Sequence, residues 1–177
     1  GALLHDGTHL IDTLRFLMDD KNPVEILTQL NKPSNGAKVE QSLLSILTFE
    51  DNVKVIVDCS DRDYFHFEID IHGDKGRIVI GNGIHHYFIK SESQYYENFN
   101  SLTEKQFPEY SDKPAFTNAI ESIVKFLKTG EIPESTGIQA LETLKVIMGI
   151  YKSGVNDKKI TYPTKITANP LEKLFQE

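Results

Sequence analysis

The chain has 177 residues, of which 39% are hydrophobic and 25% are charged, a balance typical of a folded globular domain. We therefore expect residues 1–177 to form one domain, long enough to bury a sizeable core. Acidic residues outnumber basic ones by 26 to 19, and the basic residues are scattered along the chain. This distribution argues against binding to nucleic acid, which requires a basic surface.

No apolar run approaches the roughly 18 residues of a membrane span, and the chain shows no signal-peptide pattern. The single cysteine, Cys59, lies in an apolar strand pattern and cannot form an internal disulfide. Both features favour a cytoplasmic protein in which Cys59 is a buried, unreactive thiol.

The first predicted element is a helix. Apolar residues recur at helical spacing from Leu10 to Met18, which predicts a helix with one face on a core. Residues 19–22 and Pro23 end it, because a proline disfavours the helical conformation in the residue before it.

Strands are predicted through the middle of the chain, where the apolar period changes. Phe65, Phe67, Ile69 and Ile71 alternate with polar residues, and Gly73–Gly76 supplies a turn after them. The predicted strands cover residues 24–30, 42–49, 53–59, 65–71, 77–80, 84–90 and, near the end, 160–162. The second and third form a hairpin around residues 50–52. We interpret the polar residues 91–114 as a long loop with some local order.

Two further helices precede the last strand. The first covers residues 115–128 and ends at Gly130. The second begins after an N-cap at Ser135 and runs to about Ser153. This order of elements indicates an α+β fold in which helices cover one face of an antiparallel sheet.

Chemically informative residues gather in the opening segment, at His5, Asp6, His9 and Asp12. In a helix, His5 and His9 lie one turn apart, and His9 and Asp12 also share a face. An imidazole beside a carboxylate suits proton abstraction from a hydroxyl group. Two alternatives remain open: these residues are polar groups at a helix N-terminus, or His5, His9 and Asp12 form a zinc site similar to His-Glu-x-x-His.

Other clusters favour structural roles. The polar side chains of residues 66–72 belong to one strand face, which we interpret as solvated or as a contact between subunits. His85 and His86 are adjacent strand residues and point to opposite faces. Residues 81–83 predict a turn. The chain contains no G-x-G-x-x-G fingerprint for a dinucleotide, so we expect no cofactor-binding residue in it. We do not favour the zinc alternative, because Gly7 lies inside the would-be helix and no obvious His–Asp cluster follows downstream, so no metal site is expected either.

The opening resembles the junction between the two domains of the glucose–fructose oxidoreductase / inositol dehydrogenase / MocA (Gfo/Idh/MocA) family. That family reads G-G-x-x-x-D-x-G-x-H-x-x-D before an amphipathic helix, and Gly1, Gly7, His9 and Asp12 match this pattern. Residues 72–78 are similar to the family's sheet turn, and residues 116–153 are similar to its closing helices.

The resemblance implies the family's C-terminal domain, a large, mainly antiparallel sheet with helices on one face, as in dihydrodipicolinate reductase. The other face often joins subunits, so a homo-oligomer is expected. It also implies an N-terminal Rossmann domain, absent from this chain, that binds NAD or NADP. The implied reaction is oxidation of a sugar, a polyol or a similar hydroxy compound.

Within this resemblance, His9 falls on the family's histidine, which accepts a proton or orients a hydroxyl group. Asp12 is a candidate for substrate binding. The family's preceding acid falls on His5, so that its role passes either to Asp6 or to His5 itself. This departure leaves room for relatives that use the cofactor for hydrolysis or elimination. A zinc hydrolase and a non-catalytic oligomerisation domain are the alternative functions.

Overall fold

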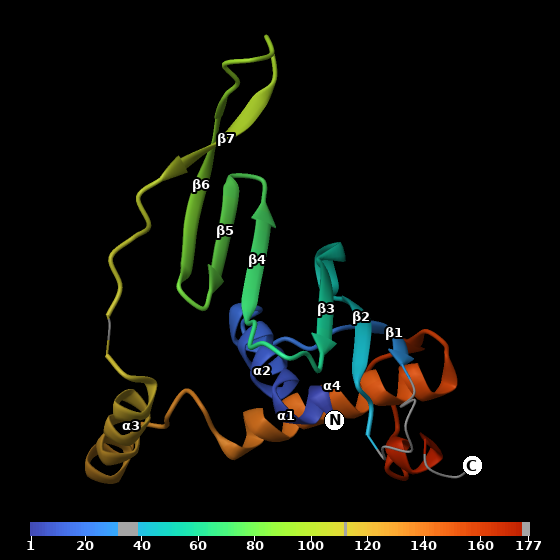
Figure 1. Ribbon diagram of the computed structural model, residues 1–177. Coiled ribbons are helices and arrows are strands. Elements are labelled where there is room, and N and C mark those ends of the chain that lie inside the picture. Colours follow the sequence, from blue (N-terminus) through green and yellow to red (C-terminus); the bar gives the residue numbers. More distant parts are fainter. Residues whose placement is uncertain (32–38, 112, 175–177) are drawn as a thin grey trace. The chain divides into compact units, whose positions relative to one another are not determined.

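The computed structural model describes residues 1–31, 39–111 and 113–174 (Figure 1). Its contacts group the chain into two compact units, Gly1–Asp61 with Ser122–Glu177, and Arg62–Glu121. Each unit contains one antiparallel sheet of four strands. None of the described helices is long and apolar enough to cross a membrane.

The first unit is built on a sheet of order β3-β2-β1-β8. Its elements are α1 (Ala2–His5), α2 (Gly7–Leu17), β1 (Glu25–Asn31), β2 (Ser42–Thr48), the short 3-10 helix η1 (Glu50–Asn52), β3 (Lys54–Ser60), α4 (Gly137–Asn156), β8 (Ile160–Thr161) and a second 3-10 helix, η2 (Pro170–Leu174). The predicted opening helix, the hairpin and the final strand are confirmed.

Helix α4 packs against β1 on the inner face of this sheet. Ile26, Leu47 and Ile150 are fully buried there, as the alternation of the strands predicts. The helix lies so close that a Cβ atom added at Gly149 would stand 2.9 Å from Cδ1 of Ile26. A small residue is therefore required where α4 crosses β1.

The outer face of the same sheet carries an exposed apolar row. Leu27 pairs with Ile46, and Ile46 pairs with Ile56, so the three side chains lie side by side across β1, β2 and β3. Their exposed fractions are 43%, 38% and 71%. The sheet thus has apolar residues on both faces.

The ends of two helices are set by local chemistry. Helix α2 ends at Leu17, where Asp19 and Asp20 adopt positive φ angles. The N-cap of α4 is Thr136 and not Ser135, because Gln139 stands three residues after Thr136 and completes a capping box with it. Helix α4 also runs three residues beyond Ser153, to Asn156.

The second unit is a meander of order β4-β5-β6-β7. Its strands are β4 (Glu68–Gly73), β5 (Gly76–Gly81), β6 (Ile84–Glu92) and β7 (Asn100–Lys105). Helix α3 (Ala115–Thr129) begins in this unit and ends in the other, and Gly130 follows it with a φ of 74°, as expected of a C-terminal glycine.

Two predictions in this unit were wrong. Residues 100–105 are not part of a loop, because the long strand β6 gives them an edge for pairing in spite of their polar sequence. Strand β4 starts at Glu68, so Phe65 and Phe67 precede it. Glu68, the first residue of β4, pairs with Gly81, the last residue of β5. The chain then turns into β6, so β5 has no residue left to pair with Phe65 and Phe67.

The α+β fold class is confirmed. The strands of the single large sheet that the resemblance implies are divided here between two hydrogen-bonded sheets of four.

Candidate functional site

The four predicted site residues all lie on α1, on α2 or between them. His5 ends α1, Asp6 forms the break between the helices, and His9 and Asp12 follow on α2. All four are exposed. Nδ1 of His5 lies 2.9 Å from Oδ1 of Asp6, with 85% and 66% of the two side chains exposed. The segment therefore presents an imidazole–carboxylate pair, a second imidazole and a second carboxylate on the surface of one unit.

A buried carboxylate, that of Glu40, holds the start of this segment against α4. Glu40 is only 1% exposed, and its Oε1 accepts hydrogen bonds from the backbone N–H of Leu3 (3.1 Å) and from the hydroxyl of Tyr151 (2.6 Å). The other oxygen, Oε2, has no hydrogen-bond partner among the described residues and lies 4.0 Å from the nitrogen of Gly1. Glu40 thus joins α1 to Tyr151 in the C-terminal half of α4.

Sequence reasoning did not identify Glu40 or Tyr151. Burial raises the pKa of Tyr151, and its hydrogen bond to Glu40 raises it further, so the phenol stays protonated and donates to the carboxylate. A lone glutamate before an apolar strand carries no signal of a contact with a residue 111 positions away.

Gly7 and Cys59 complete the support. A Cβ atom at Gly7 would lie 2.9 Å from Cδ1 of Leu3 and 3.0 Å from Sγ of Cys59, so any larger residue at the start of α2 would displace these buried side chains. Burial raises the pKa of the Cys59 thiol to about 11, and the nearby carboxylate of Glu40 adds to this effect. The predicted burial of Cys59 is confirmed.

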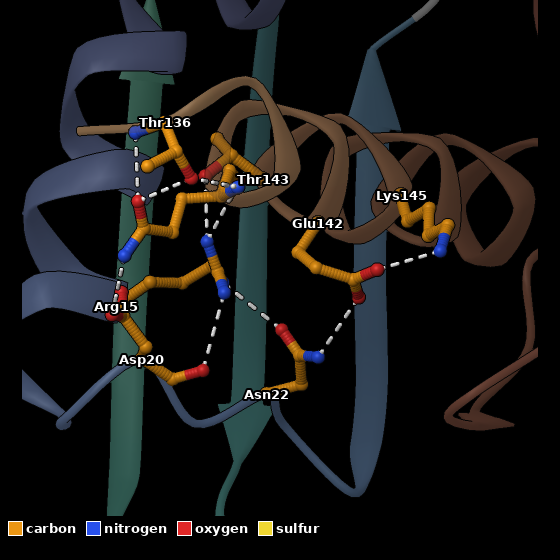
Figure 2. A network of polar contacts seen from close by, with 8 residues as sticks. Arg15, Asp20, Asn22, Thr136, Glu142, Thr143 and Lys145 are labelled. Carbon is orange, nitrogen blue, oxygen red and sulfur yellow. Dashed lines mark hydrogen bonds and ion pairs between the residues drawn. The ribbon is translucent and has the colours of Figure 1, made fainter. Parts of the chain in front are cut away.

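Asp12 is tied to the core through a polar network. Its Oδ1 accepts a hydrogen bond from the hydroxyl of Thr143 on α4 (2.7 Å), and the same hydroxyl accepts one from Nη1 of Arg15 (3.0 Å). Figure 2 shows the guanidinium of Arg15 between Thr143 and Asn22, with Glu142 and Lys145 farther along α4. Lys145 holds the pKa of Glu142 below its usual range.

An open hollow of about 500 Å³ with a mixed polar and apolar lining lies beside this network and is lined by Asn22, Glu142, Lys145 and Tyr162, among others. Burial raises the pKa of Tyr162, with a smaller effect from Glu142, so the phenol is neutral at physiological pH. None of the four candidate residues belongs to the lining of this hollow.

Three of the remaining histidines, His72, His85 and His86, make surface contacts. His72 and Arg77 both contact Asp70, and the paired hydrogen bonds from Arg77 hold the pKa of Asp70 below its usual range. His86 contacts Glu104, whereas His85 stacks on Tyr110. In residues 1–31, 39–111 and 113–174, no three His, Cys, Asp or Glu side chains are grouped as a metal site would require.

The family model for the C-terminal alpha/beta domain of the Gfo/Idh/MocA oxidoreductases matches residues 1–162. The chain belongs to this oxidoreductase family. The matched range includes the opening segment and both sheets.

Solved structures share the fold at low sequence identity. The WlbA dehydrogenase from Bordetella pertussis, in complex with NADH and UDP-GlcNAcA, is 18% identical, with a TM-score of 0.68 over 93% of this chain and 46% of that one. The aldose-aldose oxidoreductase from Caulobacter crescentus, complexed with glycerol, is 17% identical, with a TM-score of 0.73 over 91% and 47%. A putative NADPH-dependent oxidoreductase from Desulfitobacterium hafniense is 15% identical, with a TM-score of 0.74 over 99% and 49%.

The chain therefore spans about half the length of these Gfo/Idh/MocA structures. No curated protein sequence matches it significantly.

Proposed function

We propose that this chain is the substrate-side domain of an NAD(P)-dependent oxidoreductase that acts on a sugar, a polyol or a similar hydroxy compound. Membership of the Gfo/Idh/MocA family supports the reaction class. The hydroxyl-rich molecules bound in two of the similar structures, UDP-GlcNAcA and glycerol, support the substrate class. Because this sequence has no glycine-rich phosphate turn, the cofactor is assigned to a Rossmann domain in the longer protein.

The position of His9 carries the proposal. His9 falls on the family's histidine, and it is exposed on α2, whose first residue, Gly7, packs against Leu3 and Cys59. Its imidazole accepts the proton of the substrate hydroxyl group, as general base catalysis requires. A bound nicotinamide supplies the acceptor for the hydride.

The role of the family's missing acid is assigned to the pair of His5 and Asp6. The 2.9 Å contact supports this assignment, because the carboxylate of Asp6 orients the imidazole of His5. Asp12, three residues after His9 on the same helix, is proposed to bind a substrate hydroxyl group.

The outer face of the first sheet is proposed to join subunits of a homo-oligomer. The exposed row of Leu27, Ile46 and Ile56 supports this interface, because adjacent exposed aliphatic side chains favour association. We also propose a cytoplasmic location, where a thiol such as Cys59 stays reduced.

The test is steady-state kinetics of the full-length protein with NAD or NADP and a panel of D-glucose, myo-inositol and glycerol. His9→Ala is expected to lower kcat by about 10²–10⁴-fold with an unchanged thermal midpoint. The matched control is His72→Ala, which removes an exposed histidine from β4 and is expected to retain full activity. Comparing His5→Ala with Asp6→Asn identifies the residue that supplies the acid. A His9→Ala variant with normal kcat contradicts the proposal.

A further inference from the structure

The network beneath Asp12 contains a buried cation that forms no direct ion pair with any described carboxylate. Arg15 is 3% exposed, and its guanidinium donates four hydrogen bonds, all to uncharged oxygen atoms. The acceptors are Oδ1 of Asn22, the carbonyl oxygens of Gln139 and Asp20, and the hydroxyl of Thr143. A buried charge requires compensation. The carboxylates of Asp12 and Glu142 provide it, since they follow Thr143 and Asn22 in the network.

The direction of each hydrogen bond follows from Arg15. A guanidinium only donates, so the oxygen of Thr143 must accept from Nη1, and the hydroxyl hydrogen is left for Oδ1 of Asp12 at 2.7 Å. On the other side, Oδ1 of Asn22 accepts from Nε, which turns the Asn22 amide so that Nδ2 donates to Glu142. The order Glu142–Asn22–Arg15–Thr143–Asp12 therefore has one consistent arrangement of hydrogens, and Figure 2 shows its part from Glu142 to Thr143.

This arrangement fixes one oxygen of Asp12 and leaves the other available. Oδ1 is held by Thr143, and the side chain of Asp12 is exposed on α2. No hydrogen bond to Oδ2 is formed within the described parts of the chain. Because Thr143 and Arg15 are both buried, the direction of Oδ2 is set by residues that lie beneath the surface.

We propose that Thr143 and Arg15 are positioning residues that orient the carboxylate of Asp12 to accept a hydrogen bond from a substrate hydroxyl group. This inference rests on the proposed function and adds two residues to it, one of them 131 positions from Asp12 in the sequence. The hydroxyl of Thr143 is the group that matters, and its methyl group is not.

The first test is independent of activity and uses the full-length protein. Thr143→Val keeps the shape of the side chain and removes the hydroxyl, whereas Thr143→Ser keeps the hydroxyl. In a double-mutant cycle of Thr143→Val with Asp12→Ala, the unfolding equilibrium constants are expected to depart about fivefold from multiplicative behaviour. Multiplicative effects show that Thr143 does not hold Asp12, and overturn the inference.

The second test is kinetic, with the same panel of hydroxy compounds. Thr143→Val is expected to raise KM about tenfold with a smaller change in kcat, and Thr143→Ser is expected to restore KM. In the Asp12→Ala background, Thr143→Val is expected to change KM less than twofold. If Thr143 has a purely structural role, Thr143→Val lowers stability equally in the wild-type and Asp12→Ala backgrounds and leaves KM unchanged. That result overturns the inference.

The two proposals fail differently. A His9→Ala variant with normal turnover, or a wild-type protein that oxidises none of the panel, contradicts the proposed function, and the unfolding cycle still decides whether Thr143 holds Asp12. A normal KM for Thr143→Val, in an enzyme that depends on His9, contradicts the positioning role alone.

Discussion

Removal of the Glu40 carboxylate is expected to destabilise the first unit and release the start of α1. Glu40→Ala leaves the N–H of Leu3 and the hydroxyl of Tyr151 without their acceptor in a buried site. Each unpaired donor costs about 1–3 kcal/mol, and relief of the buried charge, whose Oε2 has no partner among the described residues, offsets part of this. The expected net loss in unfolding free energy is about 3 kcal/mol.

Glu40→Gln separates the effect of the charge from that of the acceptor. The glutamine keeps an oxygen at the position of Oε1, so both donors stay paired, and the expected loss is about 1 kcal/mol. Glu50→Ala, which removes an exposed glutamate from η1, is the matched control and is expected to change the free energy by less than about 0.5 kcal/mol.

The assay is urea unfolding followed by circular dichroism, together with tyrosine fluorescence, because the chain has no tryptophan. A midpoint for Glu40→Ala equal to that of the wild type would refute the reasoning, since it would show that the two donors do not depend on Glu40. Equal losses for Glu40→Ala and Glu40→Gln would show that charge, and not the acceptor geometry, stabilises the site.

The packing and the sequence lead to four further predictions. With a pKa of about 11, only about one Cys59 in a thousand is a thiolate at pH 8, so a thiol reagent should label it only after unfolding; rapid labelling of the native protein contradicts its burial. Folding raises the pKa of the Cys59 thiol from 9.0, so the neutral thiol contributes its full stabilisation below pH 9. This contribution is lost as the pH rises through 11, and the thermal midpoint measured between pH 8 and pH 11 is expected to fall accordingly. Ile56→Lys is expected to lower the mass measured by light scattering to that of the monomer without unfolding the chain. Val53→Lys, outside the strands, is the control, and equal masses for both variants count against the sheet interface. Calorimetry of this chain with NAD and with NADP should show no saturable heat, and micromolar binding would mean that the cofactor site is misplaced.

The fold was predictable where the period of apolar residues was clear. The alternation through Val55, Val57 and Cys59 located β3 and its buried face, and the helical spacing after Leu10 located α2. Strand β7 was missed because its residues are mostly polar, and it forms only through pairing with β6. Its existence depends on a neighbour, which periodicity within one segment does not report.

Only the site residues that are close together in the sequence were predictable. The family pattern pointed to His9 and Asp12, and the spacing placed them on one helix. Glu40, Thr143 and Tyr151 act through contacts that join distant segments, and no local pattern signals them. Arg15 belonged to the predicted helix, but its burial and its polar partners became visible only with α4 in place.

The most direct test of the central claim follows a labelled hydrogen atom. The full-length protein is incubated with NAD or NADP and D-glucose, myo-inositol or glycerol that carries deuterium on its hydroxyl-bearing carbons, and the nicotinamide product is examined by mass spectrometry. A hydroxyl dehydrogenase transfers the deuterium directly, so the reduced cofactor should gain one mass unit in the wild type, and the transfer should slow by about 10²–10⁴-fold in His9→Ala. Reduced cofactor without deuterium, or no reduction with any of the three compounds, would contradict the assignment of this domain to a sugar or polyol dehydrogenase.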